Sequence, residues 1–203
     1  MKLLMHTCCA PCSVFCIDEL KKENIFPDLY WYNPNIHPYK EYESRRNCLT
    51  EYAKKLNLKA IIEDEYGLDE FCRNVIEDLD GRCTKYCYPV RLYKTFEYAK
   101  QNGYDTVTTT LLYSIYQKHD YIKYLCEKYS KEFGIDFLYR DFRVGFWEGH
   151  NKAKEEGLYM QKYCGCVFSE EDRYVKKKKD SLNLPEGFEW KRWHHILFRI
   201  WIL

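Results

Sequence analysis

KLLMHTCCAPCSVFCIDELKKE, residues 2–23, contains a strand, a cysteine-rich loop and a helix in that order. Residues 2–7 form a short, mostly apolar run, which predicts a buried strand that ends at the cysteines. Pro11 suits the first turn of a helix, and residues 12–23 have helix-compatible spacing of their apolar side chains. This unit predicts the beginning of an α/β fold.

Strands and helices continue to alternate beyond this unit. The predicted strands cover residues 28–33, 59–63, 105–110 and 135–139, and the predicted helices cover 38–56, 68–79, 89–101 and 117–133. Such alternation is typical of βαβ units, so we expect a parallel sheet flanked by helices. Ligands of open parallel sheets bind beyond the carboxyl ends of the strands. The cysteine loop and the loop after residue 110 should therefore lie at the functional edge.

No internal repeat, low-complexity segment or linker divides the chain, so we expect one domain over residues 1–203. The part after residue 139 is expected to be helical or irregular. Residues 175–203 are expected to form a C-terminal extension packed on the domain. Its lysine run, 176–179, suggests a solvated helix end, and the apolar segment 190–203 suggests a closing helix or, alternatively, a partner-binding segment.

Composition restricts the class of protein. The chain has 32 basic and 31 acidic residues, so no large uniform electric field is expected. Nucleic acid would have to bind through a local patch and aromatic stacking, for which the 20 tyrosines offer material, although tyrosine also serves in cores. We find no secretory signal and no apolar run of membrane-spanning length. Eleven cysteines without a signal predict a reducing compartment, the cytoplasm.

Seven of the eleven cysteines fall into three tight clusters. They are Cys8, Cys9 and Cys12, then Cys83 and Cys87, then Cys164 and Cys166. Clusters of this kind are typical of sites for iron–sulfur clusters or zinc, which take thiolate ligands. Because the side chains of neighbouring residues point in different directions, we expect Cys8 and Cys9 to serve two metal centres. The other four, Cys16, Cys48, Cys72 and Cys126, are expected to be buried apolar residues.

Local features of the clusters favour thiolates. Cys12 is expected in the first helical turn, where free N–H groups stabilise negative charge. Gly165 lets the backbone approach a cluster closely. Arg82 and Arg91 supply positive charge beside Cys83 and Cys87.

Several other functions remain as alternatives at this point. A structural zinc site with four cysteines would leave three cysteines unexplained. An ATP-dependent thiolase would need a glycine-rich phosphate loop, and CCAPCS contains no glycine. A thiol–disulfide enzyme could use Cys9 and Cys12, but the two further clusters would be superfluous. A zinc-stabilised RNA-binding or partner-binding module without catalysis stays open.

Six segments occur in an order that resembles the cobalamin-independent epoxyqueuosine reductases. The segments are HTCCAPCS (6–13), YNPNIHPYKEYESRR (32–46), RCTKYCYPVRL (82–92), TTTLLYSIYQKHDYI (108–122), YRDFR (139–143) and GLYMQKYCGCVFS (157–169). The resemblance spans about residues 1–174. One departure is the spacer between Cys83 and Cys87, which has three residues where the family often has two.

The resemblance implies a fold, a reaction and cofactors. The implied fold is a nucleotide α-hydrolase-like, Rossmann-like sheet in which the cysteine loop replaces a phosphate-binding loop. The implied reaction is the last step of queuosine synthesis, in which epoxyqueuosine in the tRNA anticodon loop loses its epoxide oxygen. The implied cofactors are a [4Fe–4S] cluster and a neighbouring mononuclear iron, and an unidentified electron donor must supply the electrons. The partner is then a tRNA that carries epoxyqueuosine, and no membrane is involved.

The residues themselves supply candidates for each role. All seven clustered cysteines are candidate metal ligands, and all except Cys12 are candidate ligands of the iron–sulfur cluster. Asp141 is a candidate carboxylate ligand, and its alternative interpretation is a salt bridge to Arg143 or Arg140. The candidate substrate contacts are Asn35, Tyr88, Arg91, Thr109, Arg143 and Tyr163, and Arg45 and Arg46 are further candidate RNA contacts.

Overall fold

A five-stranded parallel sheet forms the centre of the fold, as predicted. The computed structural model describes residues 1–176. Its strands are β1 (Leu3–His6), β2 (Asp28–Trp31), β3 (Ala60–Ile62), β4 (Thr106–Thr109) and β5 (Asp136–Phe137), in the order β3-β2-β1-β4-β5. Every neighbouring pair is parallel, and His6 at the end of β1 pairs with both Tyr30 and Thr109. The predicted α/β fold with a parallel sheet is therefore confirmed, and the observed strand order is Rossmann-like.

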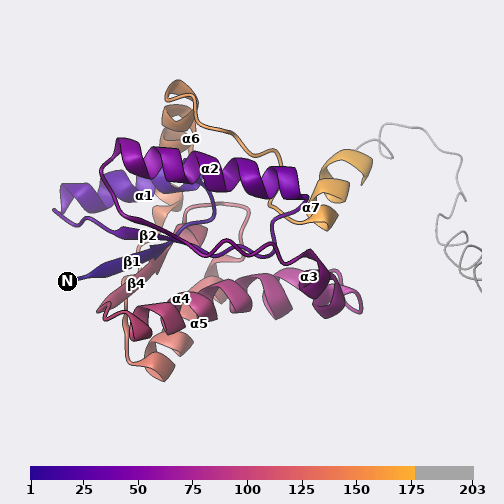
Figure 1. Ribbon diagram of the computed structural model, residues 1–203, viewed down its shortest axis with the longest axis horizontal. Helices are drawn as coiled ribbons and strands as arrows, with labels where there is room; N and C mark the ends of the chain where they lie inside the picture. Colours follow the sequence, from indigo (N-terminus) through magenta and orange to yellow (C-terminus); the bar gives the residue numbers. More distant parts are fainter. Residues whose placement is uncertain (177–203) are drawn as a thin grey trace, which may run out of the picture.

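Helices cover both faces of this sheet (Figure 1). One layer contains α1 (Ala10–Lys22), α2 (Tyr39–Lys55) and α6 (Phe146–Glu155), and the other contains α4 (Tyr88–Gln101) and α5 (His119–Phe133). The short helices α3 (Leu68–Val75) and α7 (Val167–Glu171) lie at the right-hand end in Figure 1. No helix within residues 1–176 combines the length and apolar character that a membrane span requires.

Short helical turns complete the described chain. They are a π-helical turn at Cys83–Cys87, 3-10 turns at Thr110–Leu112 and Phe142–Gly145, and a second π-helical turn at Asp172–Lys176. The predicted helix over 68–79 ends at Val75, and the predicted strand over 135–139 is reduced to two residues. The predicted character of the chain beyond Lys176 concerns residues outside the described part.

Burial in the core explains why β1 is mostly apolar. All four residues of β1 are buried, because helices cover the sheet on both sides. Many tyrosines, among them Tyr30, Tyr42 and Tyr88, are core residues. Of the four isolated cysteines, Cys16 and Cys126 are buried as predicted, whereas Cys48 and Cys72 are only half-buried.

The strand order also locates the functional edge. From β1 the chain continues to β2 and β3 on one side of the sheet, and it then returns to place β4 and β5 on the other side of β1. The direction in which strands are added therefore reverses between β1 and β4. The loop after β1 holds the first cysteines, and the turn Thr110–Leu112 follows β4. Loops that leave neighbouring strands on opposite sides open a crevice, which is where such folds bind ligands.

Candidate metal centre and substrate cavity

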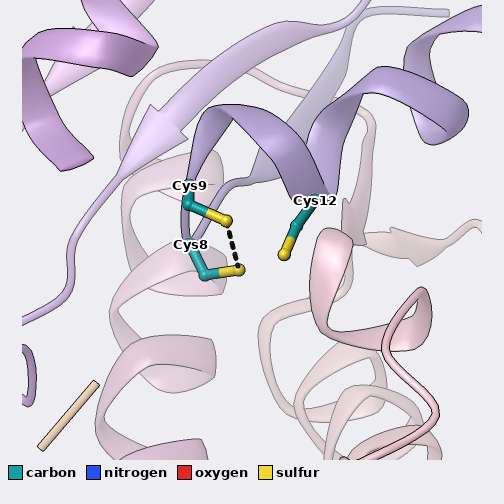
Figure 2. Close-up of side chains that lie close together, drawn as sticks. All are labelled: Cys8, Cys9 and Cys12. Atoms are coloured by element: carbon teal, nitrogen blue, oxygen red, sulfur yellow. Dashed lines mark hydrogen bonds between the residues drawn. The ribbon is translucent and has the colours of Figure 1, made fainter. Parts of the chain in front are cut away.

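Three sulfur atoms meet at the carboxyl end of β1. The Sγ atoms of Cys8, Cys9 and Cys12 lie within 4.8 Å of one another, and those of Cys8 and Cys9 are 3.8 Å apart. Figure 2 shows the three sulfur atoms turned toward a common space. Three converging thiols that form no disulfide can hold a metal ion.

The convergence of Cys8 and Cys9 corrects a prediction. Their adjacency predicted that the two thiols would point toward different metal centres, but they share one space. The physical reason is the change of conformation at Cys9, which is extended and immediately precedes α1. Cys12 then lies about one helical turn further on, so its side chain returns to the same side.

The three thiols shift one another's pKa values. Hydrogen bonds with Cys12 and Cys9 lower the pKa of Cys8 well below its usual value. Burial raises the pKa of Cys9, and the bond to Cys8 raises that of Cys12. A bound metal would take the three side chains as thiolates and release their protons.

Cys83 and Cys87 lie on the π-helical turn that leads into α4. With three residues between them they stand four positions apart, which places both side chains on one helical face. The Cys87 thiol donates to Cys83 and lowers the pKa of Cys83 to about 6, and the positive charges of Arg82 and Arg91 act in the same direction. The unusual three-residue spacer thus suits a paired ligand set.

The third loop is held in place by a buried ion pair. Arg45 donates to the carbonyl oxygens of Cys164 and Tyr163 at 2.9 Å each, and its salt bridge to Glu41 measures 2.6 Å. Tyr159 donates its hydroxyl to the same glutamate. This network fixes the backbone from which Cys164 projects.

Gly165 allows the third loop to pass close to the body of the protein. Its φ is +157°, and a Cβ atom there would lie 3.3 Å from Cγ1 of Ile36. Its carbonyl oxygen accepts a hydrogen bond of 2.7 Å from the backbone N–H of His37. Glycine at this position thus allows a close approach to Ile36, and the predicted approach of this backbone to a metal cluster stays a prediction.

The three cysteine loops surround one end of the sheet. A cavity of about 630 Å³ is lined by Cys8, Cys12 and Cys164, which joins the first loop to the third. Cys87 and Cys166 share a small buried apolar cluster, which joins the second loop to the third. Among the described residues, only the first set brings three sulfurs within 4.8 Å.

Asp141 and Arg143 are paired with each other. Their side chains form a salt bridge of 2.6 Å, and Asp141 also accepts from the backbone N–H of Arg143. These bonds hold the pKa of Asp141 at about 2. The structure thus places Asp141 in the alternative salt bridge, outside the group of three sulfurs.

The remaining predicted contacts occupy different environments. Tyr163 lines the cavity and donates its hydroxyl to the carbonyl oxygen of His37. Thr109 is buried, pairs with His6 Nδ1 at 3.0 Å and accepts from the backbone of Leu111. Asn35 is buried, and its Oδ1 has no protein partner.

The predicted arginine contacts are engaged within the protein. Arg91 is buried and donates to the Cys87 carbonyl oxygen, and Arg45 is the buried clamp described above. Arg46 forms a salt bridge with Asp64. These placements leave the guanidinium groups near the cysteine loops or tied to carboxylates.

Two glutamines contact the sulfur atoms and were not predicted. Gln161 Nε2 lies 3.4 Å from Cys12 Sγ, and Gln117 Nε2 lies 3.5 Å from Cys164 Sγ. Tyr88 donates to Gln117 Oε1 at 2.7 Å and so orients this amide. Both glutamines stand inside segments that carry the resemblance, but only the three-dimensional structure reveals their contacts.

The chain is similar to known proteins of one family. The family model described as "QueH: Epoxyqueuosine reductase QueH" matches residues 3–172. A protein of this name from Dehalococcoides mccartyi is 37% identical over 175 residues, which are 86% of this chain and 96% of the relative. The relative of the same name from Thermotoga maritima is 32% identical, with 86% and 93% covered. That from Histophilus somni is 34% identical, with 84% and 73% covered. The chain therefore belongs to the epoxyqueuosine reductase QueH family.

Proposed function

We propose that this protein is an oxidoreductase that converts epoxyqueuosine in the anticodon loop of tRNA to queuosine. The observation that carries the proposal is the meeting of Cys8, Cys9 and Cys12 beside a large cavity, in a chain of this family. The cavity of about 630 Å³ falls within the ordinary range for sites that take a small molecule or a nucleoside.

The reaction requires two electrons and two protons. Both C–O bonds of the epoxide break, a carbon–carbon double bond forms, and the oxygen leaves as water. Because no thiol of the site is consumed, an external one-electron reductant must supply the electrons. In the test tube a chemical reductant such as dithionite can take this role.

The donor set of the site fits iron. Three converging thiols and four further cysteines nearby offer soft ligands, and an iron–sulfur cluster is held by cysteine thiolates. The sulfurs of Cys8, Cys9 and Cys12 would hold one metal ion. The sulfurs of the other four clustered cysteines would be the ligands of a [4Fe–4S] cluster; they are Cys83, Cys87, Cys164 and Cys166. When bound, these groups would supply single electrons and a Lewis acid for the epoxide oxygen.

The protein's own residues prepare this centre. The Thr110 hydroxyl and the amides of Gln117 and Gln161 donate to the sulfurs of Cys8, Cys164 and Cys12, and so orient them. Burial raises the pKa of Cys9, and the positive charge of the buried Arg45 guanidinium opposes part of that rise, in the direction of the thiolate that a metal requires. Cys8, Cys12 and Cys164 line the cavity, so a modified base bound there would lie beside these sulfurs.

The test is an anaerobic reduction assay with matched variants. The protein is mixed with dithionite and tRNA that carries epoxyqueuosine, and the nucleosides are then analysed by mass. We expect wild type to form queuosine. Cys9→Ala should contain less iron and lose activity, because it removes one of the three converging sulfurs.

Cys16→Ala is the matched control on the same helix. Its thiol is buried but lies outside the group of three sulfurs, so iron and activity should persist. The proposal fails if iron-loaded wild type leaves epoxyqueuosine unchanged, or if Cys9→Ala retains full activity. A colourless protein that binds zinc and RNA without reducing the epoxide would favour the noncatalytic module.

A further inference from the structure

Four aromatic rings form a continuous surface on one wall of the cavity. We define the aromatic wall as Tyr116, Phe146, Trp147 and His150, all of which line the cavity with Cys8 and Cys12. The Phe146 ring centroid lies 5.8 Å from that of Tyr116, 5.1 Å from Trp147 and 6.2 Å from His150. Tyr116 is 76% exposed and Trp147 is 64% exposed.

Two glycines fix the aromatic wall against the cysteine helix. A Cβ atom at Gly145 would lie 2.0 Å from the ring of Phe15, and one at Gly149 would lie 2.7 Å from Cβ of Phe15. Only glycine at these positions lets α6 pack so closely on α1. Phe146 and Trp147 belong to the same short stretch, so the tight packing holds them beside Cys12.

A hydrogen bond secures the loop that carries Tyr116. Tyr113 donates its hydroxyl to the carbonyl oxygen of Phe146 at 2.7 Å, which ties the segment after β4 to the start of α6. The exposed rings are therefore parts of a rigid surface. A rigid and exposed aromatic surface beside a cavity is typical of a binding site.

Positive charge accompanies the rings. Lys162 and Arg173 line the same cavity and are exposed. The carboxylate of Asp172 in the same lining forms a salt bridge with Arg82. Exposed aromatic rings next to cationic side chains are what proteins use to bind single-stranded nucleic acid, by stacking bases and neutralising phosphates.

We propose that the aromatic wall stacks the nucleobases of the anticodon loop next to the reacting nucleotide, with Tyr116 and Trp147 as the principal platforms. This inference rests on the proposed function and names the part of the substrate that the cavity recognises. The epoxide ring then reaches toward Cys8 and Cys12 while the neighbouring bases stay on the rings.

The first test measures RNA affinity. A fluorescent anticodon stem-loop that contains epoxyqueuosine is titrated with full-length wild type, Trp147→Ala and Tyr116→Ala, and binding is followed by anisotropy. Because stacking contributes about 1–3 kcal/mol per base, each substitution should raise the dissociation constant roughly 5- to 150-fold. Trp147→Phe, which keeps a ring, should restore most of the affinity.

Phe26→Ala is the matched control, because Phe26 is 62% exposed but lies between α1 and β2, away from the cavity. This substitution should leave the dissociation constant unchanged. Trp147→Ala should also leave the salt dependence of binding unchanged, since stacking releases no counterions. Lys162→Ala, in contrast, should reduce the salt dependence.

A second test distinguishes stacking from a merely structural role. The same titrations use a stem-loop with an abasic site next to the modified nucleotide. If Trp147 stacks on that base, wild type and Trp147→Ala should bind the abasic RNA with nearly equal affinity. An equal loss of affinity on both RNAs would overturn the stacking proposal.

Two outcomes would assign the aromatic wall to another occupant. Unchanged RNA affinity together with a lower melting temperature would mean that the rings pack against this chain itself. Unchanged RNA affinity together with a lost dimer would mean that they pack against a second copy. Either result overturns this inference while leaving the proposed function standing, provided that wild type still reduces epoxyqueuosine. Absence of reduction by iron-loaded wild type would instead refute the proposed function.

Discussion

At the scale of single residues, the buried charge of Arg45 stabilises the third cysteine loop. It is 2% exposed, pairs with Glu41 and donates to two carbonyl oxygens of the third cysteine loop. Removing one member of a buried ion pair leaves the other uncompensated, which typically costs about 3–5 kcal/mol. We predict that Arg45→Met lowers the free energy of unfolding by this amount, measured by urea denaturation of the reduced, metal-free protein.

Its neighbour provides the control for this prediction. Arg46 pairs with Asp64, whose side chain is 54% exposed. An exposed pair contributes about 0–1 kcal/mol, so Arg46→Met should change the unfolding free energy by no more than that. Equal effects of the two substitutions would contradict the role of Arg45 as a clamp.

The buried His37 side chain should make the free energy of unfolding depend on pH. Burial lowers its pKa from 6.5 to about 4. The folded state therefore favours neutral imidazole, so the stabilisation is complete above pH 6.5 and is lost as pH falls toward 4. His37→Gln should flatten the slope of unfolding free energy in this window by up to one proton, about 1.4 kcal/mol per pH unit. Some slope should persist, because burial also lowers the pKa of His6, to about 3. Identical slopes for the variant and wild type would refute the assignment to His37.

Residue identity alone predicted part of the site. The sequence singled out the seven cysteines, because three tight clusters are unusual in a reduced protein. It failed for the directions of Cys8 and Cys9, since these depend on backbone angles at the entry to α1. It also failed for Gln117 and Gln161, because a glutamine carries no spacing signal until the fold places it 3.4–3.5 Å from a sulfur.

At the scale of elements, the packing of α6 on α1 is the most demanding contact. A Cβ at Gly145 would lie 2.0 Å from the buried ring of Phe15. Overpacking of this kind costs about 1–3 kcal/mol. We predict that Gly145→Ala lowers the melting temperature and that adding Phe15→Leu restores part of the loss, since the smaller side chain makes room. If the double variant instead lost the sum of the two single decreases in melting temperature, the result would contradict direct contact between the two positions.

The elements themselves were largely predictable. All five strands and the five longest predicted helices occur, because strands read as short apolar or β-branched runs and helices as longer periodic ones. The helix α6 was not predicted separately. Gly145 precedes it and Gly149 lies within it, and glycine lowers helix propensity, so only packing against α1 explains this helix.

At the scale of the whole molecule, strand order brings loops that are far apart in the sequence to one cavity. β1 and β4 are about 100 residues apart in sequence but adjacent in the sheet, and the loops that follow both strands contribute to the cavity. The sequence predicted a parallel sheet with its site at the carboxyl edge. It did not predict the order β3-β2-β1-β4-β5, which depends on contacts between distant segments.

The iron and acid-labile sulfide content of the anaerobically purified full-length protein, measured together with its visible spectrum, tests the redox centre most directly. We expect a brown protein with at least four irons and about four sulfides per chain, because a [4Fe–4S] cluster holds four of each. Cys9→Ala should contain less iron, and Cys16→Ala should match wild type. A colourless wild-type protein that contains zinc and no sulfide would contradict the central claim that these cysteine loops hold a redox centre.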